Sequence, residues 1–418
     1  MPQTGSNASI GDVTAHFTDN QWYCHLARQT VFFSAVANRN FTKEDGYEIA
    51  REIINLAPHV LENDFSEVDD SLLDEGKLEQ IVSLEKVSDL RGFPDRWSMA
   101  GNDIFEQTDI APFRVKIAVL ENGPDEKGRF AAVLILSTHA MFEGVDAATL
   151  ARSRSIKRGA VTKKPDPVSR LKKAGFTFLA AILAPLQLLA AALFAPRIGD
   201  VKFKSLTLER NRLRQAANRL GIRQQSLIFA LASFALNEGG AGFSKKSISS
   251  LYADLSKTED FKTNDDFFQF RMIDLNLPVM EDFSDFARNV EQALTKAEEG
   301  DKNHTQILLN AMFGMHRLLH SVFPFLYNAQ LFRYSAGYDF SLSLAPPQRL
   351  EGKLTDGLIE PVFTGTYHPG FNACVFVPGR KFVTFNFSLR AKHIKNIENI
   401  PYLLEQLEQS FGPTGEQS

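Results

Sequence analysis

Residues 131–146 read AAVLILSTHAMFEGVD, and the rest of the chain is organised around this stretch. A short continuous apolar run is typical of a buried strand, and this one stops abruptly at His139. Glu143 and Gly144 follow, and a glycine suits a tight turn whose backbone angles disfavour side chains. A buried strand that ends in a histidine would hold the imidazole at a sheet end, where substrate could reach it. The alternative is a histidine packed in the core.

The segments before this stretch predict a β-hairpin that leads into it. Residues 112–120, PFRVKIAVL, alternate as a half-buried strand does, and residues 123–128, GPDEKG, supply a turn. Further upstream, residues 30–36 have the β-branched and aromatic content of a strand. Thr42 is the expected N-cap of a helix that stops before Pro58.

Composition excludes several classes of protein. The formal net charge of −4 over 418 residues gives no global field that would attract nucleic acid, so none is expected as a partner. Cys24 and Cys374 have neither metal-ligand spacing nor a disulfide framework, which favours a reducing compartment. Residues 1–13 lack the pattern of a signal peptide. We therefore expect a cytoplasmic protein.

Two clusters of metal-ligating residue types predict no metal site. Residues 62–80 are acidic, but their spacing matches no known cation loop, so a solvated helix or loop is expected. His316 and His320 share a helix face, yet Arg317 stands where a zinc protease needs glutamate. We expect both rings to be packed or to face solvent.

Residues 152–200 differ in character from the segments on both sides. Nine Lys or Arg stand against one acid between Arg152 and Lys173, and the stretch from Ala174 to Pro196 carries no charge. A helix of this length would reach roughly the ~30 Å of a bilayer core. Three interpretations are open: a membrane span, a helix lying on a bilayer with its basic neighbours at anionic headgroups, or a crossover packed on the protein or shaping an acyl-chain pocket.

The remaining residues predict a second unit of strands and helices. Residues 202–208 alternate as a strand, and helices follow at 209–220, which ends at Gly221, and at 224–237. Further strands are expected at 247–255, 267–273, 336–345, 359–364, 372–377 and 381–388, with helices at 284–297, 304–319 and 397–411.

The order of these features resembles the CoA-dependent acyltransferase superfamily with the chloramphenicol acetyltransferase-like fold. The nearest look-alike is the bacterial wax ester synthase/diacylglycerol acyltransferase-like branch, whose His-His-x-x-x-Asp-Gly motif falls here on residues 138–144, THAMFEG. Thr138 replaces the first histidine, and Glu143 replaces the aspartate. The Pro-Leu-Trp motif of that branch is similar to Pro112-Phe113, and its Ser-Asn-Val-Pro-Gly-Pro strand is loosely similar to residues 341–347.

This resemblance implies an α+β fold of two chloramphenicol acetyltransferase-like subdomains. Each would be a mixed sheet flanked by helices, with the active site in a tunnel between them. The implied boundaries are an N-terminal acyltransferase subdomain at residues 1–151, a basic and apolar crossover at 152–200, and a C-terminal acyltransferase subdomain at 201–418.

The resemblance also implies roles for single residues. His139 would be the general base that takes a proton from an acceptor hydroxyl or amine as it attacks an acyl thioester. Glu143 and Gly144 would shape the loop, and Ser341 or Ser343 would bind substrate or donate to the oxyanion. The co-substrate would be acyl-CoA or an acyl carrier protein thioester, with no further cofactor. Apart from the resemblance, the basic and apolar character of residues 152–197 favours contact with a membrane surface.

Two other functions stay open at this point. A condensation-type enzyme would form an ester or amide from carrier-protein thioesters, and the basic run would then be a docking patch for an acidic carrier. A catalytically silent relative would bind lipid or a partner, in keeping with the departures from the motif.

Overall fold

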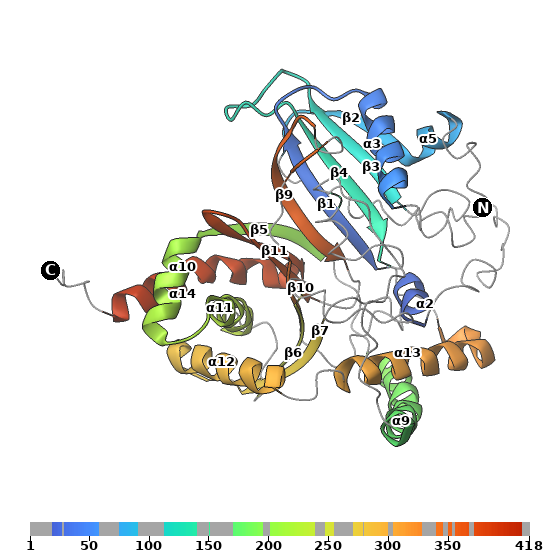
Figure 1. Cartoon of the computed structure of the whole chain (residues 1–418), viewed down its shortest axis with the longest axis vertical. Coiled ribbons are helices and arrows are strands. Elements are labelled where there is room, and N and C mark those ends of the chain that lie inside the picture. The colour runs from blue at the N-terminus through green and yellow to red at the C-terminus, as the bar shows by residue number, and fades with distance from the viewer. Residues whose placement is uncertain are drawn as a thin grey trace.

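Two mixed sheets with helices on their outer faces form the body of the protein, and a pair of crossing helices lies beside them (Figure 1). The predicted α+β class is therefore correct. This computed structural model describes residues 19–26, 29–57, 75–90, 113–139, 150, 170–194, 201–238, 247–254, 271–278, 280–299, 304–327, 340–345, 350–352, 356–367 and 372–411.

The first sheet has the strand order β2-β3-β4-β1-β9. β3 and β4 pair antiparallel, which confirms the predicted hairpin. Gly123 and Gly128 have φ angles of 83° and 71°, values that glycine tolerates best, in the turn between them. The sequence did not predict β2. The strands of this sheet are β1 (Thr30–Ala37), β2 (Val82–Val87), β3 (Phe113–Leu120), β4 (Ala131–Thr138) and β9 (Leu358–Tyr367).

Strand β9 comes from the C-terminal third of the chain, yet it lies beside β1 at the edge of the first sheet. Its register with β1 places Tyr367 opposite Thr30 and Thr364 opposite Phe33. Sequence alternation predicts a strand but not its partner, because pairing is decided by residues far away in the chain. Residues 358–367 therefore belong to the first sheet, although the predicted boundaries place them in the second subdomain; those boundaries stay a prediction.

Helices α2 (Asp19–Leu26), α3 (Lys43–Leu56) and α5 (Glu75–Ile81) belong to the first half. Thr42 caps α3 as predicted, since its side chain accepts from the backbone N–H of Asp45 while the Asp45 carboxylate accepts from the Thr42 N–H. The apolar side of α3, with Ile49 and Ile53, packs in one core with Phe33 of β1. The sequence did not predict α2, which buries Trp22 in the same core.

The second sheet has the order β5-β11-β10-β8-β6-β7. Most of its strands fall where alternation predicts them, although the strand expected at 267–273 lies at 271–278. β8 lies between β10 and β6 and is parallel to both. The strands are β5 (Val201–Glu209), β6 (Ser247–Asp254), β7 (Arg271–Pro278), β8 (Phe340–Leu344), β10 (Asn372–Pro378) and β11 (Phe382–Arg390).

The helices of the second half cover one face of this sheet (Figure 1). Gly221 ends the first of them in the left-handed conformation that favours glycine, as its position predicts. The helix expected at 397–411 is α14, which begins two residues later than predicted because a 3₁₀ segment, η6, directly precedes it. These elements are α10 (Arg210–Leu220), α11 (Gln224–Glu238), α12 (Phe283–Glu299), η6 (Ala391–Glu398) and α14 (Asn399–Ser410).

The crossover forms helix α9 (Arg170–Phe194), which includes Pro185. It packs on α13 (His304–Val322), where Ala180 and Ala184 of α9 are buried against Met312. Within the part of the chain that the structure describes, no helix is both long and apolar enough to cross a membrane. Phe313 of α13 packs against the first core, as does Tyr327, which follows the short η4 (Pro324–Leu326).

Candidate active site at the end of strand β4

His139 follows β4 directly, at the position where the sequence predicts it. Its backbone N–H donates to the carbonyl of Gln29 at 2.8 Å, so the β1–β4 ladder extends one residue beyond the strand. The side chain is half-buried, and its Nδ1 atom is buried. Because its own backbone N–H is held in the ladder, the histidine is attached to the fixed end of a strand. Its catalytic role stays a prediction.

Thr138 precedes His139 and lies directly opposite Thr30 in the β1–β4 register. Both side chains are almost fully buried, at 3% and 2% exposure. Neither hydroxyl has a hydrogen-bond partner in the part of the chain that the structure describes. An unsatisfied buried hydroxyl is costly, so its presence needs an explanation. The sequence contained part of the signal, because Thr30 begins one largely apolar strand and Thr138 ends another, but it did not show that the two residues pair.

These two hydroxyls lie on the sheet face that meets the second half of the molecule. Side chains alternate between the two faces of a strand, so Thr30 shares a face with Phe32, and Thr138 shares one with Leu136. Phe32 and Leu136 pack in one cluster with Phe203 of β5. The rings of Phe32 and Phe203 have centroids 5.1 Å apart.

Arg114 is a buried charge on this same face. Its side chain is 2% exposed, and it lies opposite Leu136 in the β3–β4 register. Leu136 and Thr138 are two residues apart and therefore share a face of β4. The guanidinium donates to the carbonyl of Phe113 at 2.9 Å. The sequence shows this arginine only as the polar member of an alternating strand, for which solvent exposure would be expected. Burial makes it a fixed positive charge near the end of β4.

Ser341 and Ser343 lie on β8, in the middle of the second sheet. Leu342, between them, points into the core beneath the helices, so alternation places both serines on the opposite face. At β5, the same face carries Phe203, which contacts Phe32 of the first sheet. The candidate serines and the Thr30–Thr138 pair are therefore on the faces through which the two sheets meet. A role for either serine stays a prediction.

Several predicted site features lie outside the described residues. Glu143 and Gly144 are among them, as is the basic run from 152 to 169. The tunnel between the subdomains stays a prediction. Among the described residues there is no group of three or more His, Cys, Asp or Glu side chains that could hold a metal ion.

The histidine pair of α13 is packed. His316 is buried, its Nε2–H donates to Gln187 Oε1 at 2.9 Å, and its Nδ1 accepts from the Tyr327 hydroxyl at 3.0 Å. Burial lowers the pKa of this imidazole to about 4, so it is neutral near pH 7. The ring of His320 lies edge-on to Trp22 and Tyr327. Both histidines thus join α13 to its neighbours.

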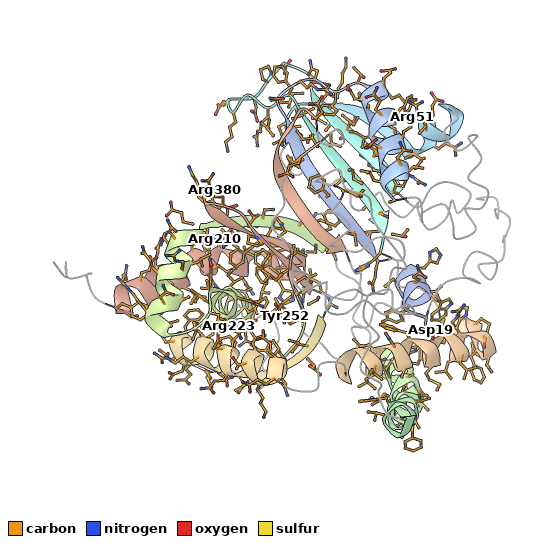
Figure 2. The ribbon with its side chains drawn as sticks, in the orientation of Figure 1. Asp19, Arg51, Arg210, Arg223, Tyr252 and Arg380 are labelled. Carbon is orange, nitrogen blue, oxygen red and sulfur yellow. The ribbon has the colours of Figure 1, made fainter. Side chains whose placement is uncertain are left out.

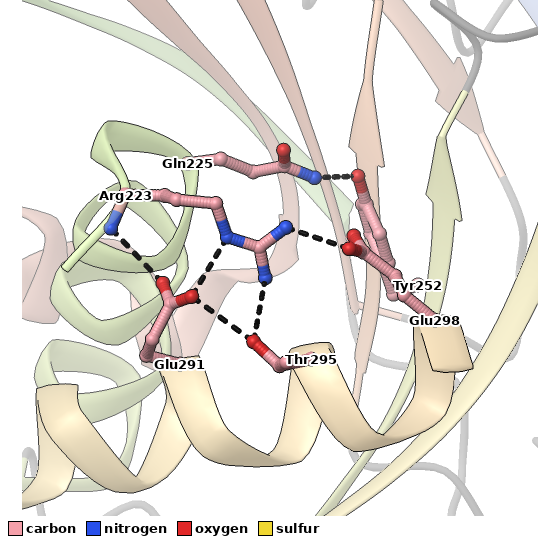
Figure 3. A network of polar contacts seen from close by, with 6 residues as sticks. All are labelled: Arg223, Gln225, Tyr252, Glu291, Thr295 and Glu298. Carbon is pink, nitrogen blue, oxygen red and sulfur yellow. Dashed lines mark hydrogen bonds and ion pairs between the residues drawn. The ribbon is translucent and has the colours of Figure 1, made fainter. Parts of the chain in front are cut away.

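A separate polar network in the second half joins α11 to α12 (Figure 3). Arg223 pairs with Glu291 at 2.8 Å and with Glu298 at 2.7 Å. Burial alone would raise the pKa of Glu291, but the hydrogen bonds and charge of Arg223 hold it below its usual value. Gln225 donates to the hydroxyl of Tyr252, which ties the start of α11 to β6. The charges are satisfied within the network, so its role is structural.

Comparison with solved structures identifies the fold. The chain is similar to the TRI3 trichothecene 15-O-acetyltransferase from Fusarium sporotrichioides, with 12% identity, a TM-score of 0.55 and 94% of each chain covered. It is also similar to the first condensation domain of the calcium-dependent antibiotic synthetase, with 12% identity and a TM-score of 0.50 over 94% of this chain and 96% of that one. The wax ester synthase/diacylglycerol acyltransferase from Marinobacter aquaeolei VT8 is more distant, with 12% identity and a TM-score of 0.44 over 92% and 95% of the two chains.

No protein-family model matches the chain, and no curated protein matches it by sequence. The structural neighbours nevertheless confirm the fold that the family resemblance implies. It is the two-subdomain fold shared by chloramphenicol acetyltransferase-like acyltransferases and condensation domains.

Proposed function

We propose that the protein is an acyltransferase that moves an acyl group from a thioester, of CoA or of a carrier protein, to a hydroxyl or amine. The observation that carries this proposal is the half-buried His139 at the rigid end of β4, in a fold that acyltransferases and condensation domains share. The apolar crossover favours a lipophilic acyl chain or acceptor.

The proposed chemistry needs one base and no covalent enzyme intermediate. His139 takes the proton from the acceptor as its oxygen or nitrogen attacks the thioester carbonyl. The C–S bond then breaks, and the imidazolium returns the proton to the departing thiolate. A neutral imidazole suits both steps because its pKa in water is close to neutrality.

The developing oxyanion needs hydrogen-bond donors that are already in place. Ser341 and Ser343 are the donors that the resemblance suggests. The structure adds the hydroxyls of Thr30 and Thr138, which are buried without a partner in the described part of the chain and lie beside His139 in the sheet. A bound substrate that accepts from either hydroxyl would remove the cost of leaving it unsatisfied.

A thiol-release assay tests the proposal. The purified protein is given a panel of acyl-CoA thioesters of increasing chain length with long-chain alcohols and amines as acceptors, and free thiol is measured. We expect His139→Ala to lower the rate by about 10²–10⁴-fold without lowering the unfolding temperature. His320→Ala, which removes a histidine of α13, is the control and should keep the rate.

The same panel separates the alternatives. A carrier-protein thioester that reacts where every acyl-CoA fails would identify a condensation-type enzyme. Equal background rates for wild type and His139→Ala with both kinds of thioester would exclude an enzyme that uses this base. The protein would then be a silent relative that binds lipid or a partner.

A further inference from the structure

Helix α9 exposes a stripe of large apolar side chains. Phe178, Ile182, Leu186 and Leu189 are four, four and three residues apart, so they lie on one face of the helix. Their exposed fractions run from 46% at Ile182 to 70% at Phe178. Figure 2 shows α9 at the lower edge of the molecule, with some of its side chains extending beyond that edge. Isolated exposed leucines are ordinary, but a continuous stripe of this kind indicates an interaction surface.

The opposite face of α9 holds the helix in this orientation. Ala180 and Ala184 are fully buried against Met312 of α13. Gln187 accepts from the buried His316, which bonds in turn to Tyr327. The helix is therefore attached to the protein along one side, and the apolar stripe faces outward as a consequence of that packing.

The end of α13 extends the same surface. Ala311 and Met315 pack with α9, and Leu318 and Val322 continue that line of residues at helical spacing. Both are more than half exposed. The chain then turns through η4, where Phe325 is 75% exposed, and Phe323 just before it is 43% exposed. The stripe of α9 with Leu318, Val322, Phe323 and Phe325 is called here the α9–α13 surface.

The charges in the sequence that leads into α9 favour one kind of occupant for this surface. α9 has no acidic residue, and the segment from Arg152 to Lys173 that leads into it carries nine Lys or Arg against one acid. An apolar helix face with aromatic residues and adjoining basic residues is the pattern of a helix that lies in a membrane interface. The apolar side chains enter the acyl boundary while the cations meet anionic headgroups.

We propose that the α9–α13 surface docks on an anionic lipid bilayer, with α9 lying along the membrane and not crossing it. An acidic protein could use the same basic residues, but it would bury the exposed phenylalanines only if it had a matching apolar groove. A bilayer accepts them without such a match. Docking would bring lipophilic acceptors or acyl chains to the protein, although the surface is inferred independently of the proposed activity.

Co-sedimentation of the full chain with vesicles tests this proposal. We expect binding to vesicles of phosphatidylcholine with phosphatidylglycerol, and much weaker binding to phosphatidylcholine alone. The double variant Phe178→Ser/Leu186→Ser changes two exposed residues, so the fold is expected to survive, and we expect it to bind at least about tenfold more weakly. The variant Phe325→Ser tests the contribution of η4 and should weaken binding as well.

The matched control is Phe382→Ser/Tyr402→Ser, which removes two exposed aromatic residues from β11 and α14. It should bind vesicles as the wild type does. Equal binding by the wild type and the Phe178→Ser/Leu186→Ser variant would overturn the proposal, as would failure of the wild type to bind any vesicle. Binding to an acidic carrier protein in place of vesicles would assign the surface to a protein partner. Thiol release measured without vesicles tests the proposed activity of His139 and does not require membrane binding. The proposed activity and the proposed membrane docking can therefore fail separately.

Discussion

Thr30 and Thr138 face each other across β1 and β4, and neither buried hydroxyl has a hydrogen-bond partner in the described part of the protein. Such a pair lowers stability, because each hydroxyl leaves water without a replacement bond. Because the pair lies next to His139, we infer that a bound substrate accepts from these hydroxyls and so offsets their cost to stability. Functional positions are where a protein commonly keeps groups that its stability does not need.

The first prediction separates these two effects at Thr138. Thr138→Val keeps the shape of the side chain and removes the hydroxyl, so the free energy of unfolding should stay the same or rise by about 1–2 kcal/mol. If the hydroxyl donates to the reacting carbonyl, the rate of thiol release should fall about tenfold. Urea unfolding and the acyl-CoA assay measure the two quantities.

Ser34→Ala is the matched control for this prediction. Ser34 lies on the same strand face as Thr30, it is 1% exposed, and its hydroxyl also has no partner among the described residues. Ser34 lies four residues beyond Thr30 along β1 and therefore away from His139. Removing its hydroxyl should change the free energy of unfolding and leave the rate of thiol release unchanged. Equal rate losses in both variants would contradict a special role for Thr138.

The second prediction concerns stability in acid. Burial lowers the pKa of His316 from 6.5 to about 4. Between these pH values the unfolded chain binds a proton that the folded protein does not, so the free energy of unfolding falls as the pH falls. The loss should be roughly 2 kcal/mol between about pH 7 and about pH 5, measured by urea unfolding.

His316→Gln removes the titrating group and should therefore flatten this pH dependence, although it lowers stability at neutral pH. Burial also lowers the pKa of His320, but that ring is only partly buried. His320→Gln should accordingly retain most of the wild-type slope. A wild-type slope that survives in His316→Gln would show that another group causes the acid sensitivity.

The third prediction concerns how closely α3 approaches the first sheet. At Gly46, an added Cβ would collide with Val82 Cγ1 and would lie 3.0 Å from Ile117 Cδ1. Alanine favours a helix by about 1 kcal/mol over glycine. The collision with two packed strand residues outweighs this gain, so Gly46→Ala should lower the free energy of unfolding by about 1–3 kcal/mol.

Gly76 of α5 provides the comparison, because no heavy atom lies within 4 Å of a Cβ built there. Gly76→Ala should leave the free energy of unfolding unchanged or raise it slightly. Thermal and urea unfolding of both variants measure the difference. Similar effects at the two glycines would mean that α3 does not pack closely on β2.

The sequence alone determined the features that depend on neighbours along the chain. The apolar run before His139 predicted a strand and the place where it ends. Gly123 and Gly128 predicted the turn, and Thr42 predicted the start of α3. These signals are local, since alternation, capping and turn conformation need only a few adjacent residues.

Only the tertiary structure decided which distant residues come together. It placed β9 beside β1, Thr30 opposite Thr138, and buried Arg114 on the face that meets the second sheet. It also attached α9 to α13 by one side, which determined that Phe178 and Leu186 face outward. Strand partners and buried faces depend on contacts between segments about a hundred or more residues apart, and no local pattern in the sequence specifies them.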